Sequence, residues 1–243
     1  MEGVIMFFQE EVKPRISDFD RNGSFAYEAM LQVLETAGSH HSDMVHDHVI
    51  AGSQSGIAWI LVEWRIKIHS LPSSTDMLKI TTWVRGKAPA AMVYRDFIVT
   101  NDNDGLLFEA EATFVLLDTA RGRMTRISEE LFTAYGPEDR MIFEDTPARL
   151  RAPETILFTH PFALRHSDID FNGHIHNTKY VDIALEALPS HVRVSASFSE
   201  IRIVYSKAIK ESDEVVTNYS LVNHAHVITV MGNNAPCTII ELK

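Results

Sequence analysis

One segment of this chain occurs twice, 150 positions apart. The residues SDFDRNGS at 17–24 return as SDIDFNGH at 167–174. Self-similarity at a fixed offset indicates a tandem duplication, so the sequence predicts two similar structural units. The copies differ at their last position, where the first has Ser24 and the second has His174. Because imidazole exchanges protons near neutral pH and a hydroxyl does not, we expect one working unit and one supporting unit.

Length and composition agree with two ordinary globular domains. The chain has 243 residues, 45% hydrophobic and 23% charged, which is room for two domains of roughly 100 to 150 residues. The apolar run Val4–Phe8 is too short for a signal-peptide core, and no stretch approaches the roughly 18 apolar residues of a spanning helix. The single cysteine, Cys237, excludes an internal disulfide. We therefore expect a soluble, cytoplasmic protein that does not insert into membranes.

The charge of the chain argues against nucleic acid as a partner. A formal net charge of −11 leaves no overall basic footprint for a polyanion. Arg121, Arg123 and Arg126 form a local basic cluster that an acidic partner could use. The simpler interpretation is a solvated strand edge, where charge discourages aggregation.

Apolar periodicity predicts one helix near the start of each copy. In the second copy a helical stripe precedes Pro189, which should end the helix, and the first copy has an equivalent stripe. The stripes are formed by Tyr180, Val181, Ala184, Leu185 and Leu188, and by Tyr27, Met30, Leu31 and Leu34. Dense β-branched and aromatic segments then predict antiparallel strands. These segments are 57–69, 77–86, 91–100 and 106–118 in the first copy, and 162–167, 192–205, 214–222, 226–231 and 237–242 in the second.

The sequence also suggests where one unit ends and the next begins. Residues 135–159 contain Gly136 and three prolines without clear periodicity, which is typical of a connecting segment. We predict an N-terminal domain at 1–134, a linker at 135–158 and a C-terminal domain at 159–243. A long helix with a curled antiparallel sheet wrapped around it makes each domain an α+β unit.

Residues 168–180, DIDFNGHIHNTKY, carry a resemblance to a known family. They are similar to the Asp-x-Asp-x-Asn-x-His-x-Asn-Asn-x-x-Tyr signature of the acyl-acyl carrier protein (acyl-ACP) thioesterases, which are built from two fused hotdog domains. Trp59, Pro72, Trp83 and Arg95 follow in the order that the family uses, so the resemblance spans nearly the whole chain. It implies two tandem hotdog domains, and hydrolysis of fatty acyl-ACP that releases free fatty acid and terminates elongation. The implied partner is an acyl carrier protein with an acyl-phosphopantetheine; no cofactor or metal is implied, and a homodimer is compatible.

Two positions depart from the family pattern. His176 stands where the family usually has Asn, and Ala208 with Ile209 occupy the positions where plant members have Glu followed by Cys. The acidic base is therefore missing from the aligned strand. Either Glu200 or Glu211 replaces it, or this member works without it, or it hydrolyses poorly.

The loop before the second helix supplies the candidate catalytic residues Asp170, Asn172 and His174. Their alternation in an extended segment can project them to one side, close to the free N–H groups of the helix N-terminus. We hypothesise that His174 holds or deprotonates the attacking water, that Asp170 orients His174 or shares the base role, and that Asn172 positions water or carbonyl. Helix capping by Asp and Asn explains what the two copies share, and chemistry better explains why they differ.

Other residues have simpler explanations. Two groups of residues could ligate a metal: His174 with His176, and the stretch that contains His40, His41, Asp43, His46, Asp47 and His48. Neither spacing matches a known closed set of metal ligands. We therefore expect the second stretch to be a solvated loop. Cys237 is expected to be a buried strand thiol. The tryptophans Trp59, Trp64 and Trp83 are expected to fill the core.

Three alternative functions remain open. The same fold acts on acyl-CoA, and the sequence does not separate the two carriers. The vacancy at Ala208 suggests a second alternative, a non-catalytic protein that binds acyl thioesters. A hotdog dehydratase is the third, and the tandem layout argues against it.

Overall fold

The chain forms two compact units. A computed structural model describes residues 7–48, 56–86, 92–195 and 197–243. The first unit comprises Met1–Ala26 and Met30–Thr146, and the second comprises Tyr27–Ala29 and Pro147–Lys243. No helix in these described ranges is long and apolar enough to cross a bilayer.

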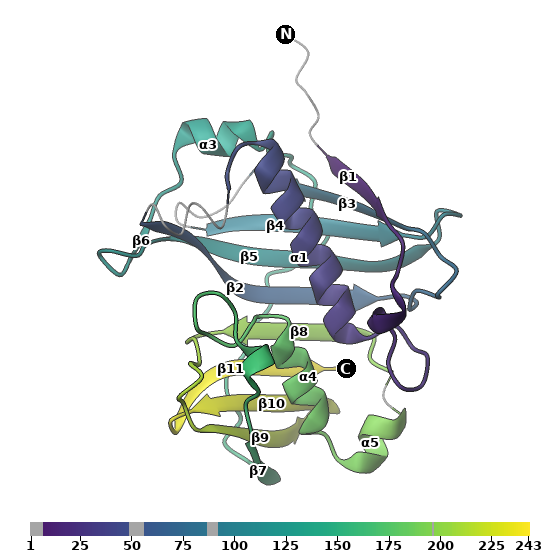
Figure 1. Cartoon of the computed structure of the whole chain (residues 1–243), viewed down its shortest axis with the longest axis vertical. Coiled ribbons are helices and arrows are strands. Elements are labelled where there is room, and N and C mark those ends of the chain that lie inside the picture. The colour runs from purple at the N-terminus through teal and green to yellow at the C-terminus, as the bar shows by residue number, and fades with distance from the viewer. Residues whose placement is uncertain (1–6, 49–55, 87–91, 196) are drawn as a thin grey trace. The chain divides into compact units, whose positions relative to one another are not determined.

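The first unit is an antiparallel sheet with one long helix on it (Figure 1). Its strands follow the order β1 (Phe8–Val12), β3 (Leu78–Val84), β4 (Met92–Thr100), β5 (Leu106–Asp118) and β2 (Ile57–Ile68), and β6 (Arg123–Thr125) pairs with β5. The helices are η1 (Ile16–Asp18), α1 (Tyr27–Met44) and α3 (Glu129–Ala134). A Cβ at Gly38 of α1 would lie 3.5 Å from the Arg95 side chain, so the helix packs closely against β4.

The second unit repeats this layout with a shorter helix. Its strands follow the order β8 (Glu200–Tyr205), β11 (Ala235–Leu242), β10 (Ala225–Gly232), β9 (Val215–Val222) and β7 (Phe158–Phe162). Its helices are η2 (His166–Asp168), α4 (Lys179–Glu186) and α5 (Ser190–Ser195). The α4 helix packs on β10 and β11 through buried Tyr180, Val181 and Ala184. The predicted α+β fold, a helix on an antiparallel sheet in each of two copies, is confirmed.

The strand predictions for the first copy hold. The predicted strand 106–118 is β5. The hairpin between β10 and β11 turns at Asn233 and Asn234, whose φ of 49° and 62° are the left-handed pair that a two-residue hairpin loop needs.

Two strand predictions in the second copy are wrong. The segment 162–167 is not a strand, because β7 ends at Phe162 and the chain then turns as the Asp168 carboxylate accepts the Arg165 N–H at 2.8 Å. The segment 192–205 begins as the helix α5 and becomes a strand only at Glu200. Pro189 precedes α5 directly, where its fixed φ favours a helix start.

The core takes most of the tryptophan side chains, as predicted. Trp64 is 2% exposed and Trp83 is fully buried. Trp59 is half-buried and donates its indole N–H to Asp47 at 2.7 Å. Cys237 is a buried thiol on β11, which confirms that prediction, and burial raises its pKa.

Candidate active site

The loop that carries the candidate residues is a tight turn closed by the Asp170 carboxylate. Its Oδ1 accepts the backbone N–H groups of Asn172 at 2.8 Å and of His174 at 3.1 Å. The Asp170 N–H donates to the His174 carbonyl at 2.7 Å, and Gly173 adopts a φ of 76°. This φ is strained for a residue with a side chain, so the glycine is required by the turn.

The first copy builds the same turn with the same bonds. The Asp20 Oδ1 accepts the N–H groups of Asn22 at 2.8 Å and of Ser24 at 2.9 Å, and Gly23 has the same φ of 76°. The Asp20 N–H donates to the Ser24 carbonyl at 2.8 Å. The aspartate and glycine that the copies share are therefore explained by the shape of the turn.

The two turns differ in the side chain at their last position, which is Ser24 in the first copy and His174 in the second. Asn172 is exposed, whereas His174 and Asp170 are half-buried. The Asp170 carboxylate contacts the main chain of His174, and within the described ranges the His174 ring makes no side-chain hydrogen bond. The three candidate residues thus share one turn, with Asp170 fixing the backbone that carries the imidazole.

The residues that follow fasten this turn to the sheet and lead into α4. The Ile175 N–H donates to the Ile209 carbonyl at 2.9 Å, and His174 forms an isolated β-bridge with Lys210. The Tyr205 hydroxyl donates to the Asn177 carbonyl at 2.9 Å. Because β8 and the segment before β9 both bind this stretch, the backbone of residue 174 is held in place ahead of the helix.

None of the acids considered from the sequence is bonded to His174. Ala208 is exposed and supplies no acid. Glu211 binds the ring of His166 at 2.9 Å and raises the pKa of that exposed histidine. Glu200 pairs with the Lys243 ammonium at 3.5 Å.

A half-buried acid that the sequence analysis missed lies on α4. Burial raises the pKa of Asp182 to about 8, and the hydrogen bond that its protonated carboxyl donates to the Glu28 carboxylate adds to the effect. The Glu28 carboxylate also pairs with the Lys179 ammonium at 2.6 Å, so the second unit contains a small cluster of charged groups. The signal in the sequence was Asp182 itself, a carboxylate between the buried residues Val181 and Ile183.

The histidine-rich stretch after residue 39 is not a solvated loop, so that prediction is wrong for His40 and His41. Both lie in α1, where the His40 ring bonds to Glu10 at 2.7 Å. The fully buried His41 accepts from the Arg95 guanidinium at 2.8 Å; burial, with Arg95 beside it, lowers the pKa of His41 to about 3. Among the described residues, no group of three or more His, Cys, Asp or Glu could hold a metal ion.

A second buried polar cluster lies in the first unit, inside the sheet. Arg85 bonds to Asp96 at 2.8 Å and to Glu111, and all three side chains are less than a tenth exposed. Burial raises the pKa of Asp96 to about 6 in spite of the neighbouring guanidinium. Because the three charged groups compensate one another within the sheet, we interpret this cluster as structural.

Comparison with known proteins links both copies to one family. Residues 6–135 match the family model of the acyl-ACP thioesterase N-terminal domain, and residues 152–238 match that of the C-terminal domain. The chain is 23% identical over 161 residues to a palmitoyl-acyl carrier protein thioesterase of Gossypium hirsutum, covering 63% of this chain and 39% of that protein. It is 24% identical over 201 residues to a dodecanoyl-[acyl-carrier-protein] hydrolase of Cinnamomum camphora, covering 77% of this chain and 52% of that protein.

The fold agrees with solved structures along nearly the whole chain. It superposes on the 12:0-ACP thioesterase from Umbellularia californica with a TM-score of 0.85 at 16% identity, covering 98% of this chain and 96% of that one. The chain spans about half or less of the curated relatives named above, which are chloroplastic proteins.

Proposed function

Because this chain belongs to the acyl-ACP thioesterase family, we propose that it hydrolyses the thioester of fatty acyl-ACP and releases free fatty acid, which ends chain elongation. The observation that carries the proposal is the pair of matched turns. Both copies fold the turn in the same way, and only the second places an imidazole on it.

In the proposed reaction His174 is the proton carrier. It takes a proton from water while the water oxygen bonds to the thioester carbonyl carbon. The C–S bond then breaks, and the departing thiolate recovers the proton from the imidazolium. Asn172 supplies an exposed amide that can hold the water or the carbonyl oxygen, and Asp170 keeps the turn in shape and adds a negative charge close to the imidazolium.

Acyl carrier protein is the proposed carrier, and acyl-CoA is the alternative. The test is to measure kcat/KM for one acyl chain, dodecanoyl, on carrier protein and on CoA under identical conditions. We expect a clear preference for the carrier protein. Equal or faster turnover of the CoA thioester would refute the choice of carrier and leave the hydrolase assignment intact.

A non-catalytic acyl-binding protein is the second candidate function. The exposed Ala208 and the absence of a bonded acid at His174 among the described residues favour it. It predicts that acyl-ACP binds, while fatty acid release stays at the rate of the uncatalysed reaction.

We also propose a cytoplasmic location and a homodimer. The single, buried Cys237 fits a reducing compartment, since it needs no disulfide partner. Light scattering on the purified protein measures the second property: a dimer has twice the 27.4 kDa mass of the chain.

A further inference from the structure

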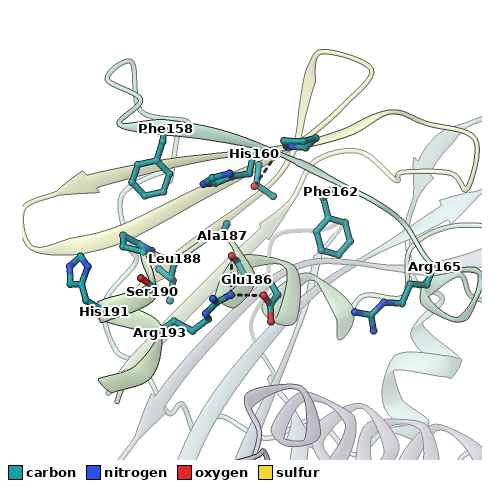
Figure 2. Close-up of a pocket in the computed structure, with 13 residues that line it drawn as sticks. Phe158, His160, Phe162, Arg165, Glu186, Ala187, Leu188, Ser190, His191 and Arg193 are labelled. Carbon is teal, nitrogen blue, oxygen red and sulfur yellow. Dashed lines mark hydrogen bonds and ion pairs between the residues drawn. The ribbon is translucent and has the colours of Figure 1, made fainter.

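The second unit contains a groove between β7 and the link that joins α4 to α5. Figure 2 shows Phe158, His160 and Phe162 on one side and Leu188, Ser190 and His191 on the other. Its volume of about 770 Å³ lies in the range of roughly 300 to 1,000 Å³ that is common for small-molecule sites. All of its lining residues belong to the second unit.

The groove exists because the helix of the second copy is interrupted. In the first copy α1 runs on for 18 residues and covers β1: Phe8 stacks on His41 at 5.5 Å, and Glu10 bonds to His40 at 2.7 Å. In the second copy α4 ends after 8 residues, and Pro189 separates it from α5. The residues that correspond to the first pair are Phe158 and His191, and both line the groove.

The charge on the groove has also changed relative to the first copy. Where β1 has the carboxylate of Glu10, β7 has His160. In the first copy the Arg15 guanidinium pairs with Asp18 at 2.9 Å. Its counterpart Arg165 lines the groove, and in the described part of the chain its guanidinium forms no ion pair with a carboxylate.

The remaining arginine at the groove is already neutralised. Arg193 pairs with Glu186 at 2.5 Å, as the dashed lines in Figure 2 show. One uncompensated guanidinium therefore remains at the Arg165 end, with His160 and His191 further along. An unpaired arginine beside a groove favours a carboxylate or another anion that it can bind through two N–H groups.

Phenylalanine, leucine, alanine and proline side chains form most of the remaining lining, beside the polar Ser190 and Thr217. Phe158, His160 and Phe162 are two residues apart on β7, so their side chains share one face of the strand. The Phe158 ring is held in place by stacking on Tyr219 at 4.5 Å, and Leu188 opposite is 4% exposed. An extended hydrocarbon chain fits such a preformed strip better than a compact polar molecule.

We propose that this groove binds a long-chain fatty acid, with its carboxylate at Arg165 and its hydrocarbon chain along Phe162 and Phe158. The choice of a fatty acid among amphipathic anions rests on the proposed function, which produces one. The site is separate from the turn at His174 and gives the second unit a place to hold product after release.

Photolabelling tests the proposal directly. Dodecanoic acid with a diazirine near its methyl end is irradiated with the full chain, and the labelled residues are mapped by mass spectrometry. We expect label on peptides that contain Phe158, Phe162 or Leu188, competed by unlabelled dodecanoate and at least tenfold less well by dodecanol. Absence of label from these peptides, or equal competition by the alcohol, overturns the proposal.

Matched variants identify the anchor. Arg165→Gln should reduce labelling of the groove at least tenfold, whereas Arg151→Gln, at an exposed arginine outside the groove, should leave it unchanged. If Arg165→Gln melts at a lower temperature than the wild type, Phe162→Asp takes its place, with the same expected loss. Unchanged labelling in a folded variant contradicts the assignment.

Labelling and hydrolysis measured on the same wild-type sample separate this proposal from the proposed function. Groove labelling in a wild type that shows no hydrolysis supports the binding site and refutes the enzyme. Hydrolysis without groove labelling supports the enzyme and refutes the binding site.

Discussion

The two strand–turn–helix segments, 8–44 and 158–195, share the fold of their turn and differ in the side chain at its last position and in the length of the helix. Both use an aspartate and a left-handed glycine to close the same turn. The first continues into an unbroken helix that covers its edge strand, and the second has an imidazole on the turn and a break in the helix. The comparison teaches that turn geometry alone does not indicate a catalytic site, because the supporting copy has it too.

The largest expected effect concerns the interior of the first unit. Arg85→Met should lower the free energy of unfolding by about 3–5 kcal/mol, because it leaves Asp96 and Glu111 buried without their cation. The control is Thr82→Val in the same sheet, whose buried hydroxyl has no partner in the described residues and should cost little. Urea unfolding measures both. Equal losses would show that the buried charges are not important for stability.

A smaller expected effect is a pH dependence of stability that comes from the helix of the second copy alone. The second copy has Asp182 where the first has Gln32. Its pKa is raised from 3.8 to about 8, so the folded protein holds a proton that the unfolded chain releases, and stability falls as pH rises between these values. Asp182→Asn should remove this dependence and stabilise the protein by on the order of 2 kcal/mol near pH 7.5.

Thermal or urea unfolding between pH 5 and 8 checks this prediction. The exposed Glu154→Gln serves as the control and should follow the wild-type curve. A parallel pH dependence in Asp182→Asn and in the wild type would contradict the assignment of the raised pKa.

The smallest effect compares the turns themselves. Asp20→Ala and Asp170→Ala each remove an acceptor for two backbone N–H groups, so each should cost about 1 kcal/mol of stability. Only Asp170→Ala should also lower turnover of acyl-ACP. If Asp20→Ala lowers turnover equally, the distinction between a working and a supporting copy is wrong.

The sequence predicted those parts of the fold that depend on local pattern. Dense β-branched and aromatic residues predicted strand 106–118, and the repeat predicted both turns. It failed at residues 192–195, where β-branched valines lie in a helix that starts after Pro189, and at His40 and His41, whose helix is stabilised by burial against β4. These outcomes depend on tertiary packing, which overrides local preference.

The candidate site was predictable only in part. Asp170, Asn172 and His174 could be chosen by comparing the copies. The hydrogen bonds of the Asp170 carboxylate to the main chain could not be read from residue types, and neither could the raised pKa of Asp182 or the unpaired side chain of Arg165. The pKa of Asp182 depends on Glu28, which is distant in sequence. The bonds of Asp170 and the side chain of Arg165 depend on which nearby groups the folded loop brings within reach.

The most direct test of the whole account is the rate of fatty acid release from dodecanoyl-ACP by His174→Ser, which gives the second turn the residue of the first. The account predicts a kcat lower by about 10²- to 10⁴-fold, with an unchanged melting temperature. Ser24→Ala, the matched change in the first turn, should retain the wild-type rate. Wild-type turnover by His174→Ser would contradict the central claim that the second copy alone carries the proton-transferring group.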